Sequence, residues 1–356
     1  MTFIERNENI AEQKIINIWE EYLKNKSSED YTTIFIMVPF CSQKCNYCQY
    51  SSKVVKFVPD LYIDNLERQF QKNSKIFKNE PIKAIAFGGG TPNMLSPKQL
   101  ERIFNITKKY WNIEVTKKNE RSFEINPYHL TDEHIDVLKN SFINRISMGI
   151  QTFNENVLNN EHRTIYSKDK IKNIYETIKS FAVVNTDLLV GLIGQNSTIL
   201  LDDVKTLLDA GINQLTIYGL NRFNKRNNIE SQPENIYKMI LDVYKVYAKN
   251  SNYSNYSYYG TNETTYCECN TFKNSMGFQY PYSTVPLGYN NCVSFTLYDD
   301  ILFGNQYPYS YFTILNKGYE RTNIIQNKME KLVTSFYNIT DRLDRTYWHS
   351  AVRNRQ

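Results

Sequence analysis

The sequence predicts an α/β fold, namely a partial (β/α)6 barrel over residues 31–222 followed by a tyrosine-rich α+β extension. Short β-branched and aromatic runs alternate with amphipathic helical patterns, and the connections between them are short. Such alternation is typical of a parallel sheet with right-handed crossovers, because parallel strands need a long connection. A cysteine loop and a glycine run each follow a strand directly, where sites in parallel α/β folds lie.

The barrel is expected to contain six strands, each a short apolar run bounded by polar or turn residues. They are Ile34–Val38, Ile82–Phe87, Arg121–Ile125, Arg145–Gly149, Asn185–Val190 and Gln214–Gly219. Helices are expected over residues 8–25, 60–78, 97–110, 131–139, 168–180, 199–210, 233–248 and 319–347. Ser96 before Pro97 is a typical helix start, and Thr131 is expected to cap a second helix.

The chain is expected to have three regions. Residues 1–30 are a helical lead-in, 31–222 the core barrel and 223–356 a region that covers the substrate. Twelve tyrosines lie between Tyr253 and Tyr311, where helical periodicity is weak. Tyrosine has a flat apolar face and a polar tip, which suits an aromatic ligand at the barrel mouth. Aromatic pairs between strands explain the same pattern equally well.

Composition narrows the class of protein. Hydrophobic residues make up 41% and charged residues 22% of the 356 positions, which is typical of a globular protein. The longest apolar run has seven residues, from Leu188 to Gly194, far short of the roughly 20 that a membrane span needs. We find no secretory signal and expect a cytoplasmic protein without a membrane partner. A net charge of +5 is too small to indicate nucleic acid.

Three of the six cysteines, Cys41, Cys45 and Cys48, lie within eight residues. Three thiolates on one short loop can bind three corners of a 4Fe–4S cluster, leaving the fourth iron open for an exogenous ligand. Zinc is an alternative, although its sites usually have a second ligand pair and the nearest His in sequence is His129. Buried apolar thiols are a further alternative. The later cysteines are expected to pack ordinarily, with a second metal site as the alternative: Cys267, Cys269 and Cys292.

Several motifs in order carry a family resemblance. The segment from Phe35 to Cys48 resembles the cluster loop of the radical S-adenosylmethionine (SAM) enzymes. Further segments are similar to the oxygen-independent coproporphyrinogen III oxidase branch, and they cover residues 31–222: Phe87-Gly-Gly-Gly-Thr-Pro92, Glu124-Ile-Asn-Pro127, Arg145-Ile-Ser-Met-Gly-Ile-Gln-Thr-Phe153 and Asp187-Leu-Leu-Val-Gly191. The branch also contains C-methylating and cyclopropane-forming enzymes, haem-degrading methyltransferases and a haem chaperone.

The resemblance implies a 4Fe–4S cluster on the three loop cysteines and SAM on the open iron, whose reductive cleavage supplies a 5′-deoxyadenosyl radical. It also implies a second SAM. Residues matching contacts to the cluster-bound SAM are Phe35, Gly89, Glu124 and Asn221. Residues matching contacts to the second are Tyr47, Gly90, Thr91, Gln151, Arg163 and Asp187. The glycines from Gly88 to Gly90 are expected to let the backbone approach SAM and present N–H donors.

Some positions depart from the branch pattern. Phe35 and Met37 stand where the branch usually has Tyr and His, which removes a proton-handling group. Lys273 stands where chaperone relatives show His. His162 precedes Arg163, whereas the branch has its His after the Arg; it is an acid/base candidate or an ordinary surface residue.

These observations lead to three hypotheses. The first is a radical SAM enzyme that C-methylates, alkylates or otherwise transforms a small or medium organic substrate, with an electron donor such as flavodoxin or ferredoxin. The second is decarboxylation of a porphyrinogen, with the tyrosine-rich region as its cradle. The third is a haem carrier without catalytic activity.

Overall fold

The computed structural model describes residues 31–48, 52–78, 80–212 and 214–220, four later strands, and single positions at 20, 23–24, 238–239, 242–243 and 246. The helix expected over residues 319–347, Cys269 and Asn221 lie outside the described residues. Only isolated positions of the helices expected at 8–25 and 233–248 are described. The boundaries at residues 30 and 222 therefore stay predictions.

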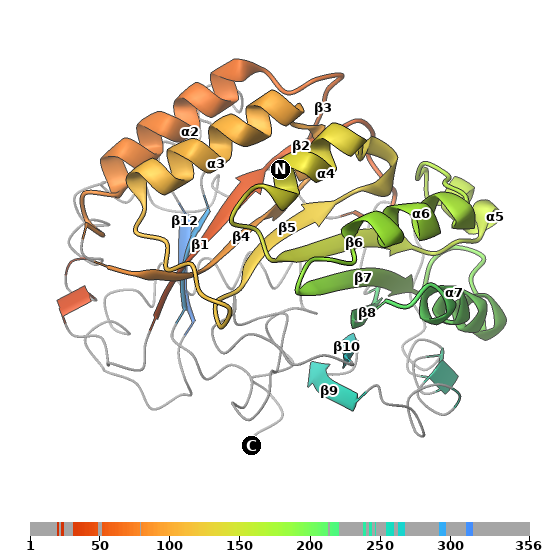
Figure 1. Ribbon diagram of the computed structural model, residues 1–356. Helices are drawn as coiled ribbons and strands as arrows, with labels where there is room; N and C mark the ends of the chain where they lie inside the picture. The colour runs from red at the N-terminus through yellow and green to blue at the C-terminus, as the bar shows by residue number, and fades with distance from the viewer. Residues whose placement is uncertain are drawn as a thin grey trace, which may run out of the picture.

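The expected six parallel strands form the centre of one sheet (Figure 1). They are β1 (Tyr31–Val38), β4 (Ile82–Gly89), β5 (Arg121–Ile125), β6 (Arg145–Gln151), β7 (Val183–Val190) and β8 (Gln214–Gly219). Each pairs in parallel with the next one along the chain. Their carboxyl ends therefore meet at one edge of the sheet, as the sequence predicts.

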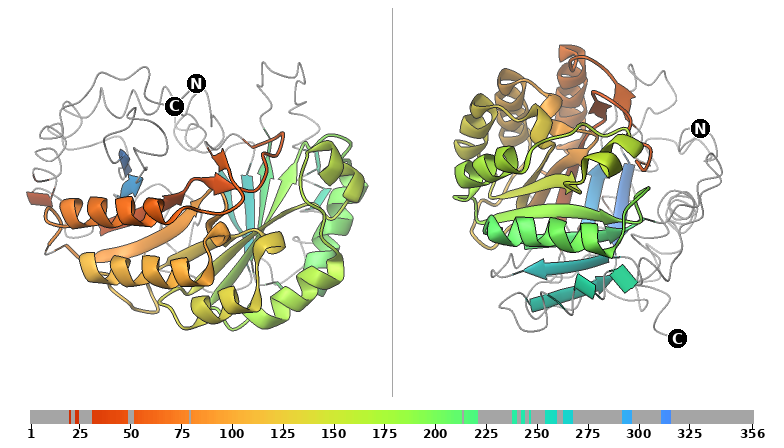
Figure 2. Two further views of the ribbon diagram at one scale, coloured as in Figure 1. Left: turned by 90° about the horizontal axis from the view of Figure 1, so that it is seen from above. Right: turned by 90° about the vertical axis from the view of Figure 1, so that its right-hand side faces the viewer.

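Helices cover the outer, convex face of this sheet (Figure 2). They are α2 (Asp60–Asn73), α3 (Pro97–Tyr110), α4 (Asp132–Lys139), α5 (Glu155–Asn160), α6 (Lys168–Ile178) and α7 (Ser197–Asp209), with 3-10 turns at Pro92–Met94 and Pro127–His129. The Ser96 and Thr131 caps are confirmed, because each side chain accepts the backbone N–H three residues later. Helix α5 is absent from the sequence prediction because its six residues are too few to give a periodic pattern.

The tyrosine-rich region contributes strands to both edges of the sheet. β10 (Glu263–Cys267) pairs antiparallel with β8, and β9 (Ser254–Tyr259) pairs with β10. At the other edge β11 (Cys292–Thr296) lies parallel to β1 and carries β12 (Tyr311–Leu315). The described strands of this region widen the sheet to ten strands, and its expected position over the barrel mouth stays a prediction.

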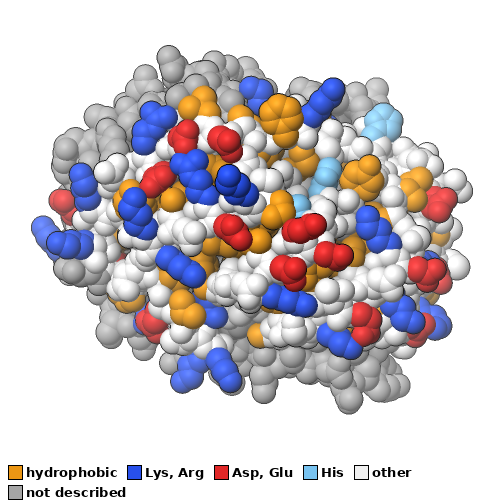
Figure 3. Space-filling model, turned by 45° about the horizontal axis from the view of Figure 1, so that its top comes forward, with side chains coloured by type: hydrophobic (Ala, Val, Ile, Leu, Met, Phe, Trp, Pro, Cys, Tyr) orange, Lys and Arg blue, Asp and Glu red, His pale blue; other side chains and the backbone are white. Residues whose placement is uncertain are grey.

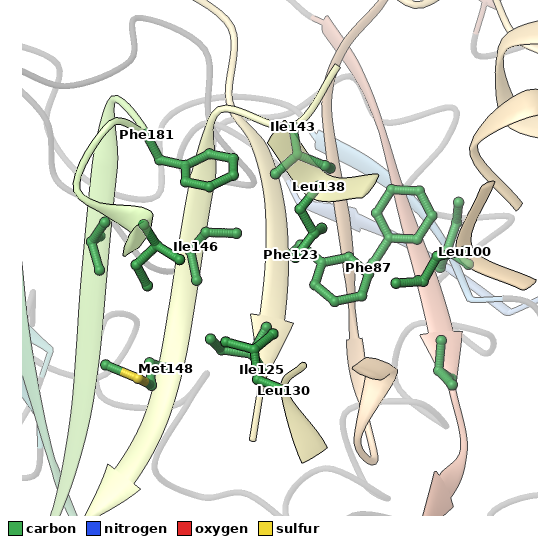
Figure 4. Packing of buried hydrophobic residues seen from close by; sticks show 14 of the residues in the cluster. Phe87, Leu100, Phe123, Ile125, Leu130, Leu138, Ile143, Ile146, Met148 and Phe181 are labelled. Atoms are coloured by element: carbon green, nitrogen blue, oxygen red, sulfur yellow. The ribbon is translucent and has the colours of Figure 1, made fainter. Parts of the chain in front are cut away.

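The apolar core lies between the sheet and the helices. Phe87 contacts Phe104 at 5.3 Å and Phe123 at 5.9 Å between ring centroids, and Leu100 and Ile146 are fully buried in the same cluster (Figure 4). Because side chains alternate along a strand, this packing turns the neighbouring positions to the inner face. On β5 and β6 those inner positions are mostly polar, which is the first structural sign of a site.

Candidate functional site

The cysteine loop follows β1 and is held by backbone pairing. A two-residue strand β2 (Phe40–Cys41) runs parallel to β3 (Lys53–Val54), and Thr91 N–H donates to the Phe40 carbonyl at 2.7 Å. Further along, Asn46 N–H donates to the carbonyl of Glu161 at 2.9 Å. The loop is thus tied at both ends to segments that follow other barrel strands.

Cys41, Cys45 and Cys48 are half-buried free thiols on this loop. The Thr91 hydroxyl donates to Cys41 Sγ at 3.5 Å, and Arg163 approaches Cys45 Sγ at 3.9 Å. Within the described residues, no three His, Cys, Asp or Glu side chains converge on a point where they could hold one metal ion. Three free, half-buried thiols on one loop fit a cluster in which each cysteine would bind a different iron, and this is the donor set that the sequence predicts.

His129, the nearest His to the cysteines in sequence, lies against the loop in space. Its Nε2 is 2.8 Å from the hydroxyl of Ser42, which follows the first cysteine. Burial lowers the pKa of His129, first through desolvation and then through the nearby charge of His134. His129 therefore stays neutral near pH 7 and shares a hydrogen bond with the loop.

Of the glycines at the end of β4, Gly88 to Gly90, the first two lie in contact with the side chain of Glu124 on β5. Gly89 N–H donates to Glu124 Oε2 at 3.2 Å, and Gly90 N–H donates to the Val38 carbonyl at 3.0 Å. The expectation that these glycines offer free N–H donors is therefore wrong for Gly89 and Gly90. Their small size matters instead, since a Cβ at Gly90 would lie 2.6 Å from the Phe40 carbonyl oxygen.

Arg163 joins the cysteine loop to β6. Its guanidinium donates to the Tyr47 hydroxyl at 2.8 Å and also to the Gly149 carbonyl. Burial raises the pKa of Tyr47 well above its ordinary value, so its hydroxyl stays protonated. These two hydrogen bonds hold the Arg163 guanidinium between the cysteine loop and the end of β6.

Gln151 ends β6 beside this group with a φ of 73°, a strained conformation for a residue with a side chain. A Cβ on Gly149 would lie 2.9 Å from Gln151 Nε2 and 3.5 Å from an Arg163 nitrogen, so both side chains border the same spot. Gln151 Oε1 and Arg163 Nε are buried without a hydrogen-bond partner. The Gln151 oxygen is an acceptor and the Arg163 nitrogen is a cationic donor. Together they suit a ligand that carries both an ammonium group and a carboxylate. The amino-acid end of SAM has that pair.

Two inner-face carboxyl groups lie deeper in the barrel. Desolvation raises the pKa of Glu124 to about 7, with a further contribution from the charge of Asp187. Desolvation likewise raises the pKa of Asp187 to about 6, although Arg145, Asn185 and Ser147 oppose the shift. Asp187 accepts from the Ser147 hydroxyl at 3.1 Å and the Asn185 amide at 2.6 Å.

Below them, a buried ion pair forms the floor of the barrel, which sequence reasoning missed. Arg145 is 1% exposed, and one of its guanidinium nitrogens lies 3.8 Å from Glu120 Oε1. The same guanidinium donates to Ser122 and Gln214, each at 3.3 Å. The signal was available, because polar residues recur at every second position in otherwise apolar β6.

Two predicted residues, Phe35 and Asn221, lie partly or wholly outside the described residues. Phe35 lies on β1, where its backbone is in register with Ala86 on β4. The side chain of Phe35 is not among those that the structure describes. Asn221 lies just beyond the described end of β8. The other predicted residues gather at the carboxyl edge of the sheet: Tyr47, Gly89, Gly90, Thr91, Glu124, Gln151, Arg163 and Asp187. Which SAM molecule each contacts stays a prediction.

Comparison with known proteins agrees with this geometry. Residues 35–207 match the model of the Radical SAM superfamily. The chain is 36% identical over 190 residues to the heme chaperone HemW of Buchnera aphidicola subsp. Acyrthosiphon pisum, covering 53% of this chain and 50% of the relative. It is 28% identical over 216 residues to the anaerobilin synthase of Escherichia coli O157:H7, covering 60% and 48%. The chain thus spans about half the length of these curated relatives.

The solved coproporphyrinogen III oxidase (HemN) of Escherichia coli has the same fold, with a TM-score of 0.68 at 16% identity over 95% of this chain and 83% of that one. A 4Fe–4S cluster and SAM are the cofactors of this family, and the residues described above fit them. No helix in the described part of the chain is long and apolar enough to cross a membrane. Residues 35–207 are therefore similar to the radical SAM superfamily, and the relatives of this chain include oxygen-independent coproporphyrinogen III oxidases.

Proposed function

We propose that this protein binds a 4Fe–4S cluster and SAM, cleaves SAM by one-electron reduction, and acts on a tetrapyrrole. The observation that carries the first part is the pair of buried, unpartnered atoms Gln151 Oε1 and Arg163 Nε beside the cysteine loop. When bound, the cofactors supply a carbon-centred radical that abstracts hydrogen. The chain's own contribution is to bind the amino-acid end of the nucleotide and shield it from water.

The tetrapyrrole part of the proposal is supported by the relatives. Their names refer to haem chaperoning, anaerobilin synthesis and coproporphyrinogen oxidation. The C-methylation that we expected from the sequence has no specific support among these proteins. A tetrapyrrole also agrees with the twelve tyrosines between Tyr253 and Tyr311, since flat aromatic surface suits such a ligand.

The radical chemistry is tested with anaerobically reconstituted protein, SAM and dithionite. We expect 5′-deoxyadenosine to form, and Cys41→Ala to abolish both the product and the cluster absorbance. Cys267→Ala, on β10, is the matched control and should retain both. A colourless protein that holds zinc, or product formation that survives in Cys41→Ala, would contradict the proposal.

The substrate class is tested separately by adding coproporphyrinogen III or haem to the same reaction. We expect mass spectrometry to detect a changed tetrapyrrole only when SAM and reductant are both present. If 5′-deoxyadenosine forms but neither tetrapyrrole changes nor accelerates its formation, the substrate assignment fails while the radical chemistry stands.

A haem carrier is the second candidate, favoured by the 36% identity to a heme chaperone. It predicts a shift of the haem Soret band on mixing, with haem recovered unaltered. Lys273 at the position where chaperone relatives show His argues against an identical haem ligand.

A further inference from the structure

The segment over residues 52–58 lies directly against the strand that carries the first cluster cysteine. β3 pairs with β2 in a register that sets Val54 opposite Cys41. Lys53 N–H donates to the Pro39 carbonyl at 2.8 Å, and Val55 N–H donates to the Cys41 carbonyl at 2.9 Å. A protein that contacts this segment is therefore one backbone hydrogen bond away from a cluster ligand.

Exposed apolar side chains project from this segment. Phe57 is 74% exposed and Val54 54%, and Leu61 on the first turn of α2 is 39% exposed. Their neighbour Tyr62 is buried and packs edge-on against Phe40 at 5.2 Å. The base of the segment is therefore fixed in the core while its apolar side chains face outward.

Exposed lysines lie on the same segment and on the cysteine loop beside it. Lys44, on the cysteine loop, and Lys53 and Lys56, on the segment, are all exposed. We call these three lysines together with Val54, Phe57 and Leu61 the strap patch. On the face shown in Figure 3, hydrophobic side chains lie among both basic and acidic side chains along the upper part. An aromatic centre with a charged rim is the usual composition of a protein–protein contact surface.

The acidic groups near the patch are already engaged. Asp60 accepts a hydrogen bond from the Gln99 side chain at 2.7 Å, and Asp64 accepts from Arg102 at 2.6 Å. Arg102 balances the charge of Asp64, whereas the neutral Gln99 amide leaves Asp60 charged; the three lysines outnumber Asp60, so the patch has a net positive charge. Two copies of such a patch repel each other, so an acidic partner is favoured over a second copy of this chain.

We propose that the strap patch is the docking surface for a small acidic protein that carries one electron to the cluster. The inference rests on the proposed function, because a cluster that cleaves SAM must be reduced once per cleavage. One electron leaves the reduced carrier and enters the cluster; no bond forms or breaks in that step. Phe57 anchors the contact, and Lys44, Lys53 and Lys56 attract the carrier and set its orientation.

The test uses the reconstituted full chain and reduced flavodoxin, an acidic flavin protein, with electron transfer followed by anaerobic stopped-flow absorbance. We expect Phe57→Ser and Lys56→Glu each to slow transfer by about tenfold, and the wild-type rate to fall with added salt. Dithionite and methyl viologen need no docking surface, so cluster reduction and 5′-deoxyadenosine formation with them should be unchanged in both variants.

A matched patch at the opposite end of the strands provides the controls. Val115 is 59% exposed, and Lys117 and Lys118 beside it are exposed before β5 begins. Val115→Ser and Lys118→Glu should leave flavodoxin-driven transfer unchanged. Wild-type transfer rates in Phe57→Ser and Lys56→Glu would overturn the inference, as would equal losses with dithionite. A changed oligomeric state with unchanged transfer would assign the patch to self-association. If the wild type forms no 5′-deoxyadenosine even with dithionite, the proposed function itself is contradicted.

Discussion

Glu124 and Gly89 are joined by a hydrogen bond across β4 and β5, in which the Glu124 carboxylate accepts the Gly89 backbone N–H at 3.2 Å. The preceding glycine leaves room for this carboxylate, because a Cβ on Gly88 would lie 2.6 Å from the Glu124 carboxyl carbon. The glycine run therefore fixes the position of a titratable group as well as the turn that follows the strand.

Gly88→Ala and Gly90→Ala are expected to fail in different ways. A Cβ at Gly88 meets a side chain, so Glu124 moves; SAM affinity should fall at least about tenfold while the cluster is retained. A Cβ at Gly90 meets the backbone of Phe40 and Val38, which cannot move without displacing the cysteine strand. That variant should lose about 1–3 kcal/mol of unfolding free energy and bind less iron. Iron content and equilibrium dialysis with SAM separate the two, and equal iron loss in both would contradict the distinction.

The raised pKa of Glu124 predicts how stability depends on pH. With a folded pKa of about 7 against an ordinary value of 4.5, the folded chain holds a proton that the unfolded chain releases. This contribution is full below pH 4.5 and is lost as the pH rises through 7, on the order of 1–3 kcal/mol. Glu124→Gln should therefore unfold at higher denaturant than the wild type at pH 8 and at a similar concentration at pH 5.

The measurement is denaturant unfolding of cluster-free protein at both pH values. Glu155→Gln, at an exposed position on α5, is the control and should parallel the wild type. A Glu124→Gln curve that also parallels the wild type would show that the carboxyl is ionised at no cost in the folded state.

The sequence predicts the barrel well because its signals are local. Each barrel strand is a short run rich in β-branched or aromatic residues, and both helices with a predicted cap begin at a recognisable residue such as Ser96. The cysteine trio is visible for the same reason. By contrast, the contact of Arg163 with Tyr47 joins residues 116 positions apart, and no local pattern encodes it. The same holds for Arg145 and Gln214, 69 positions apart, and for the pairing of β11 with β1.

Gln151 combines a strained backbone with a buried acceptor oxygen, and we expect that oxygen to bind SAM. Its φ of 73° is natural for glycine, so Gln151→Gly should change the unfolding free energy by less than about 1 kcal/mol although a side chain is lost. SAM affinity should nevertheless fall at least about tenfold, because the buried acceptor is gone. His162, with a φ of 51° and an exposed side chain, provides the control.

His162→Gly should retain SAM affinity and the yield of 5′-deoxyadenosine, measured by isothermal titration and chromatography. Loss of product with intact affinity in that variant would revive His162 as an acid/base residue. Unchanged affinity in Gln151→Gly would instead show that the unpartnered oxygen has no ligand.

The ion pair between Arg145 and Glu120 is buried, because the two side chains are only 1% and 0% exposed. Arg145→Met removes the cation beside the buried Glu120 carboxylate, so we expect a loss of about 3–5 kcal/mol of unfolding free energy. Adding Glu120→Gln removes that charge and should recover most of the loss, because a neutral pair has no ionic desolvation cost. Arg102→Met breaks a salt bridge whose side chains are 40% and 47% exposed, and it should cost no more than about 1 kcal/mol. Denaturant unfolding of the wild type and of these three variants separates these energies. If the double variant is no more stable than Arg145→Met alone, the floor of the barrel depends on packing by Arg145 rather than on charge balance.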